Sequence, residues 1–246
     1  MATVAKYLLG MWIAATVVLA YRWLPPAEGF AVPEAAPIVA LHLPLALVAI
    51  IAAVVAAAQG VRYLTGRNLA SDARSKNAAA LAALFCLLTT VTGSAFARVQ
   101  WGGYWNWDPK QTCIAILLAV YAAYFVLRAG VDDPEKRAAV SGVYIVFAGV
   151  LTPMLGYVVP KYLAKFSLHP TNTQFDSRYW TVILFATLGF TGLYVWMQNL
   201  ANRFDVAGLV LQQRLAEAEE APAPRLVTMA TAASGADTEA TAWTTR

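Results

Sequence analysis

The sequence predicts an all-α, polytopic membrane protein with six transmembrane helices, and three observations support this. Hydrophobic residues make up 59% of the 246 residues and charged residues only 13%, whereas soluble domains carry about 25% charged residues. The mean hydropathy is +0.55. Six separate stretches are also apolar over the length of about 20 residues that a helix needs to cross a bilayer core.

In chain order, the six predicted helices lie at approximately residues 7–24, 37–59, 77–97, 110–128, 139–159 and 180–200. If the N-terminus is cytoplasmic, the inside segments hold 12 of the 18 Lys and Arg residues and the outside segments hold 6. Because positive residues favour the cytoplasmic side, we expect both termini to be cytoplasmic. The net charge of +4 therefore needs no nucleic-acid partner, and no basic cluster with interleaved aromatics is present.

The chain changes character after residue 202, so we expect two parts, a membrane domain at 1–202 and a cytoplasmic tail at 203–246. The tail begins with an expected amphipathic helix that offers Val206, Leu209, Val210 and Leu215 to one face. Its Ala- and Thr-rich end is expected to be disordered. The first apolar segment is followed directly by Arg22 and Trp23 and lacks a small-x-small cleavage site, which favours a retained helix over a signal peptide.

A stretch rich in aromatics, WGGYWNWDPKQT, spans residues 101–112, just before the fourth apolar segment, and uses three of the 8 tryptophans. Two interpretations stay open: an aromatic belt at the membrane boundary, or a rigid shelf for a large planar ligand. The glycines favour the shelf, because they let the backbone turn or approach a flat molecule closely. The candidate residues are Trp101, Gly102, Gly103, Tyr104, Trp105 and Trp107.

The chain has only two histidines, His42 in IVALHLPLAL and His169 in KFSLHPTNTQF, each followed closely by a proline. The expected orientation puts both on the outer side, with the aromatic stretch. Either one alone is compatible with an interfacial side chain bonded to a neighbour, but together two neutral imidazoles suit the axial positions of haem iron. A zinc or copper site would need further ligands nearby. The two cysteines, Cys86 and Cys113, form no CxxCH site for covalent haem.

Asp108 and the flanking cations complete the candidate site. In DPKQ, Asp108 is expected to cap the fourth helix, with Pro109 in the first helical position and Gln111 placed for a capping box. The two propionates of haem would need cationic partners. Among the six cations of the outer segments, Arg98 and Lys110 flank the aromatic stretch and are the best candidates.

These residues resemble a known family. TVTGSAFARVQWGGYWNWDPKQT, residues 90–112, resembles the WWD signature of the haem-handling membrane proteins of cytochrome c assembly. LHLP at 41–44 and SLHP at 167–170 resemble the two histidine motifs of that family, in the same chain order. Six helices and two histidines fit its CcmC type (haem exporter protein C), although WDPKQT is closer to the lyase-type ending WDPKET.

The resemblance implies a function in cytochrome c maturation. Such a protein would hold haem b non-covalently at the outer face of the bacterial inner membrane, with His42 and His169 on the iron. It would present haem to the chaperone CcmE, as a platform and not an enzyme, beside CcmD and the CcmAB transporter. The alternatives are a cytochrome c haem lyase of the larger family, a b-type electron-transfer subunit and a small-solute transporter.

Overall fold

The structure, a computed structural model, describes residues 3–162, 167–169 and 175–220. Within these residues it is entirely helical and has no strand. The elements are α1 (Thr3–Arg22), the 3-10 turn η1 (Pro33–Ile38), α2 (Val39–Gly66), α3 (Leu69–Trp101), α4 (Pro109–Ala129), α5 (Pro134–Pro153), the π-helical turn η2 (Met154–Val158), α6 (Val159–Tyr162) and α7 (Ser177–Glu220). The chain divides into two units, one ending at Asp205 and the other beginning at Val206.

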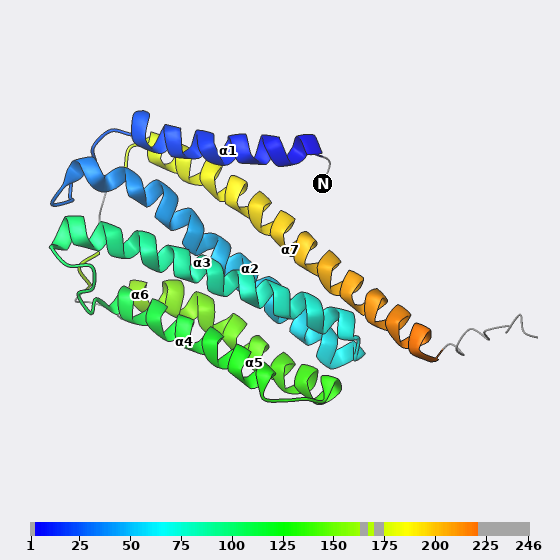
Figure 1. Ribbon diagram of the computed structural model, residues 1–246. Coiled ribbons are helices and arrows are strands. Elements are labelled where there is room, and N and C mark those ends of the chain that lie inside the picture. The colour runs from blue at the N-terminus through cyan, green and yellow to red at the C-terminus, as the bar shows by residue number, and fades with distance from the viewer. Residues whose placement is uncertain (1–2, 163–166, 170–174, 221–246) are drawn as a thin grey trace, which may run out of the picture. The chain divides into compact units, whose positions relative to one another are not determined.

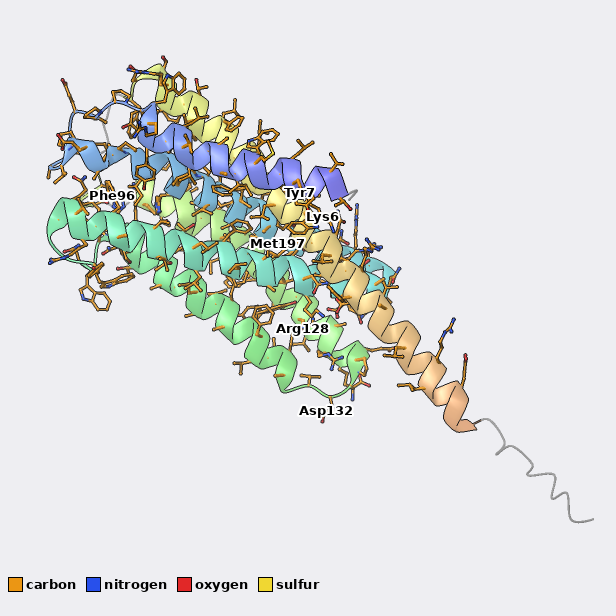
Figure 2. The ribbon with its side chains drawn as sticks, turned by 45° about the horizontal axis from the view of Figure 1, so that its top comes forward. Lys6, Tyr7, Phe96, Arg128, Asp132 and Met197 are labelled. Atoms are coloured by element: carbon orange, nitrogen blue, oxygen red, sulfur yellow. The ribbon has the colours of Figure 1, made fainter. Side chains whose placement is uncertain are left out.

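Six helical segments in the described residues are long and apolar enough to cross a membrane, which confirms the predicted fold class. Each is longer than the apolar stretch that predicted it. In Figure 1 the α1–α2 and α3–α4 connections lie at one end of the first unit, and the α2–α3 and α4–α5 connections lie at the other. Figure 2 places Phe96 at the first end and Arg128 and Asp132 at the second.

The main core lies among α2, α3, α4 and α5, and small residues line its centre. Ala52, Ala53 and Ala56 of α2 are buried in one cluster with alanines 78, 79 and 82 of α3. Small side chains let helix backbones approach closely, which is how helices commonly pack in a membrane. A second cluster joins α1, η1 and the start of α7 around Ala20, Tyr179 and Val182.

The sixth apolar segment and the expected amphipathic tail helix belong to one continuous helix. α7 runs without interruption from Ser177 to Glu220. No glycine or proline falls between residues 200 and 207, so nothing in the sequence ends the helix there. Of the expected apolar face, Val206 and Leu215 are 59% and 57% exposed, while the side chains of Leu209 and Val210 lie outside the described residues. So does the tail segment expected to be disordered, residues 221–246.

The fifth apolar segment is not one regular helix. α5 ends at Pro153, and a π-helical turn at Met154–Val158 leads into α6. Proline has no backbone N–H to donate and disturbs the preceding turn, and the irregularity begins directly after Pro153 as a π turn. Such turns often occur at functional sites.

A buried ion pair links α3 to α4 at the Arg128 end. The two guanidinium NH2 groups of Arg128 donate to the two carboxylate oxygens of Asp72 at 2.7 and 2.8 Å. The side chains are only 10% and 12% exposed. Removing one partner would leave the other charge buried and unpaired, which is strongly destabilising.

We therefore predict that Asp72→Asn lowers the free energy of unfolding in detergent by about 3 kcal/mol. The matched control is Asp176→Asn, because Asp176 pairs with Arg178 at the surface, where an ion pair contributes little. Chemical denaturation followed by circular dichroism measures both. Equal losses in the two variants would contradict the prediction.

Candidate functional site

A cavity of about 580 Å³ lies at the Phe96 end of the bundle and contains both histidines in its wall. This volume is in the usual range for cofactor and small-molecule sites. Its deeper wall is apolar and includes Ala46, Ala49, Ile50 and Leu117. The polar groups of the wall include Thr89, Ser94, Lys110, Gln111, Lys161 and Ser167. A ligand that fits the cavity is therefore apolar over most of its surface and carries a few polar groups.

His42 enters the cavity from the first turn of α2 and is fixed by Thr92 of α3. The Thr92 hydroxyl lies 3.0 Å from His42 Nδ1 and also 2.9 Å from the Leu88 carbonyl. A hydroxyl has one proton, and a carbonyl can only accept it. When the Thr92 hydroxyl donates to the carbonyl, its oxygen can accept from Nδ1–H, and in that tautomer the lone pair of His42 Nε2 is free for a ligand.

Gly93 makes room for the His42 ring. A Cβ at this position would lie 2.9 Å from His42 Cε1 and 3.5 Å from Nδ1, closer than carbon atoms pack. The absence of a side chain thus forms a cradle for the imidazole, next to the threonine that orients it.

His169 is fixed by Asp108. Its Nδ1 lies 2.9 Å from Asp108 Oδ1, and it packs edge-on against Trp101 with ring centroids 4.8 Å apart. The other carboxylate oxygen, Oδ2, accepts from the Ser167 hydroxyl at 2.9 Å and from the Leu168 backbone NH at 2.6 Å. Asp108 therefore holds the SLH segment against the start of α4.

The charges at this contact leave His169 neutral and Asp108 ionised. Burial and the nearby positive charge of Lys110 lower the pKa of His169 to about 4, against the opposing effect of Asp108. Burial alone would raise the pKa of Asp108, but the His169 ring and the hydrogen bonds from Lys110 and Leu168 hold it below its ordinary value. Nδ1–H of His169 then donates to the carboxylate, and its Nε2 is free, as in His42.

Asp108 is the N-cap of α4, as predicted, and accepts from the Lys110 backbone NH at 2.8 Å. The predicted capping box is different in detail. Gln111 does not return to the Asp108 backbone; its Oε1 accepts from the Asn106 NH and its Nε2 donates to the Tyr104 carbonyl. Gln111 thereby holds the aromatic loop itself, because the loop folds back over the first turn of the helix.

The aromatic residues do not form a single shelf. Trp105 lines the cavity, whereas Tyr104 and Trp107 are 64% and 76% exposed. Trp101 contacts His169 but is not part of the cavity wall. Gly102 ends α3 at a φ of +80°, which glycine adopts without strain, and Trp107 has a φ of +54°. The loop thus presents one tryptophan to the cavity and two aromatic rings to the surroundings.

The structure also separates the two predicted cations. Lys110 lines the cavity. Arg98 does not, because its guanidinium donates to the Gly102 carbonyl and lies over the Tyr104 ring. Lys161 of α6, which was one of the six outer cations but not among the two preferred ones, is the second lysine of the wall. Thr92, Gly93 and Ser167 were also not identified from the sequence, although the TGS and SLH motifs that contain them were.

Within the described residues, no group of three or more His, Cys, Asp and Glu side chains is placed to hold a bare metal ion. Cys86 and Cys113 are free and buried. The donors that converge on the cavity are two imidazoles from different segments, a set that suits the two axial positions of a metal already held by a macrocycle.

Comparison with known proteins is consistent with this donor set. The family model described as CcmC: Heme exporter protein C matches residues 1–220. The chain belongs to the Heme exporter protein C family.

Among its relatives, the Heme exporter protein C of Bradyrhizobium diazoefficiens is 26% identical over 68% of this chain and 65% of its own length, slightly under two thirds. That of Escherichia coli K12 is 27% identical over 76% of this chain and 81% of its own. A ccmC-like mitochondrial protein of Marchantia polymorpha, named for cytochrome c biosynthesis, is 27% identical over 63% of this chain and 66% of its own length.

The cradle at Gly93 gives a stability prediction for this member of the Heme exporter protein C family. Gly93→Ala should lower the free energy of unfolding by about 1–3 kcal/mol, because the new methyl group overpacks against His42. Gly10→Ala is the matched control: nothing lies within 4 Å of its Cβ, and alanine favours a helix more than glycine does. Chemical denaturation in detergent measures both. An unfolding free energy of Gly93→Ala equal to or above that of Gly10→Ala would contradict the prediction.

Proposed function

We propose that this protein binds haem b non-covalently in the cavity, with His42 and His169 as axial ligands, and presents it to the haem chaperone CcmE. Membership of the Heme exporter protein C family supports a role in haem export during cytochrome c maturation. The observation that carries the proposal is the pair of imidazoles in one cavity wall, each with Nδ1 engaged and Nε2 left for iron.

Haem is cargo here, and it supplies the iron that the two imidazoles would hold. The apolar wall formed by Ala46, Ala49 and Ile50 would accept the apolar edge of the macrocycle. Trp105 would contact a ring face. Lys110 and Lys161 would pair with the two propionates. The chain's own groups thus bind, orient and desolvate the cargo, and the protein acts as a platform and not as a catalyst.

The orientation and the partners belong to the same proposal. Most cations lie at the segments expected to be cytoplasmic, so the cavity would face the periplasm across a bacterial inner membrane. The chain contains no P-loop motif. Energy for transport would therefore come from the CcmAB transporter, and CcmD would join the complex.

We predict that the purified chain carries about one haem b per molecule, released by pyridine as the b-type haemochrome. His42→Ala and His169→Ala should each change the absorption spectrum or lower the occupancy, because each removes one axial ligand. Tyr7→Ala, at an exposed position of α1 remote from Phe96 (Figure 2), is the control and should bind normally. Unchanged haem binding by the double histidine variant would refute the ligand assignment.

We further predict that Lys110→Met and Lys161→Met each weaken haem binding about 10-fold, since a hydrogen bond to a charged group contributes about 1.5–3 kcal/mol. Titration with haem and with its dimethyl ester measures the effect, because the ester lacks the negative charges. Arg98→Met is the matched control and should bind haem like the wild type. A loss caused by Arg98→Met, or an equal loss for the ester, would contradict the assignment.

A further inference from the structure

The two imidazoles have unequal supports. Nδ1 of His169 lies against a carboxylate, that of Asp108, at 2.9 Å. Nδ1 of His42 lies against a neutral hydroxyl, that of Thr92, at 3.0 Å. A carboxylate that accepts from the far nitrogen of a ligating histidine makes the near nitrogen a stronger donor and fixes the ring. A neutral hydroxyl whose own proton is already donated to a carbonyl strengthens the near nitrogen and fixes the ring much less.

The supports also differ in how firmly they are themselves held. Asp108 is 2% exposed and accepts from Lys110, Ser167 and Leu168 in addition to the histidine. Thr92 has only the backbone carbonyls of its own helix as other partners. The Asp108 carboxylate is thus fixed by groups from two segments, whereas the Thr92 hydroxyl is held, apart from His42, only by its own helix.

We propose that Thr92 and Asp108 are positioning residues that make the two axial ligands inequivalent, so that His42 leaves the iron before His169 does. This inference rests on the proposed function. When the bond breaks, the electron pair returns to His42 Nε2, where it needs no proton. The vacated position is open to a donor from the acceptor, while His169 keeps the cargo in the cavity. Release then proceeds in two steps and not by simultaneous loss of both ligands.

The test uses the full chain in detergent, loaded with haem and reduced. Carbon monoxide binds to six-coordinate ferrous haem only after a ligand leaves, so its rate at saturating concentration reports dissociation of the labile histidine. Thr92→Val should raise this limiting rate about 10-fold, because loss of a hydrogen-bond partner of a metal-binding histidine typically costs about 10- to 100-fold in metal affinity or activity. Thr92→Ser restores the hydroxyl and should restore the rate.

Thr90→Val is the matched control. Thr90 lies two residues away in the same helix, lines the cavity and donates to the Cys86 carbonyl. Because it has no hydrogen bond to His42 among the described residues, the limiting rate should not change. If Thr92→Val behaves like Thr90→Val, the inference is overturned.

Asp108→Asn tests the other ligand, because asparagine caps a helix as well as aspartate does but carries no charge. It should raise the reduction midpoint potential, since a weaker donor stabilises the ferric state less, and change the limiting rate less than twofold. A larger rate increase than in Thr92→Val would mean that His169 is the labile ligand and would overturn the inference. If this variant does not fold, the Thr92 series decides alone.

Failure of the inference and of the proposed function are distinguishable. A wild-type chain that binds no haem in a haem-replete host overturns both. A second outcome overturns only the inequivalence of the two ligands. In that outcome haem is bound through both histidines, but Thr92→Val and Asp108→Asn change the limiting rate and the midpoint potential equally.

Discussion

The site depends on one carboxylate. Asp108 ends the aromatic loop, caps α4 and binds Ser167, Leu168 and His169 across about 60 residues of chain. A buried carboxylate is stable only when its oxygens are fully hydrogen-bonded, so the segments that supply its donors must meet at this point. The same requirement that stabilises the buried charge therefore places one of the two imidazoles in the cavity wall.

α3 supplies the other half of the site. Thr92 and Gly93 form the seat of His42, and ten residues later Gly102 ends the helix and begins the aromatic loop. α3 thus sets the positions of both the His42 ring and the loop that leads to Asp108. At the opposite end, Asp72 of the same helix pairs with Arg128 of α4, so α3 contacts α4 through a buried ion pair as well.

The cavity combines a largely apolar wall with a few polar groups that come from separate segments. The π turn after Pro153 brings Tyr157 and Lys161 to this wall, where a regular helix would present other residues. Since the polar groups come from separate segments, the cavity can hold an amphiphilic cargo in one orientation. Under the proposed function, the unequal supports of the two histidines would set the order in which they release that cargo.

The sequence by itself determined the six helices, the capping role of Asp108 and the two candidate ligands, because these depend on local composition and on backbone bonds made within each helix. Only the tertiary structure decided which groups support the ligands. Thr92 lies 50 residues from His42, and nothing local distinguishes it from Thr90. The cavity wall contains Lys161 and not Arg98, because the Arg98 guanidinium turns to the Gly102 carbonyl of its own helix end and the turn after Pro153 precedes Lys161; the charge pattern marks both cations but not the direction of their side chains.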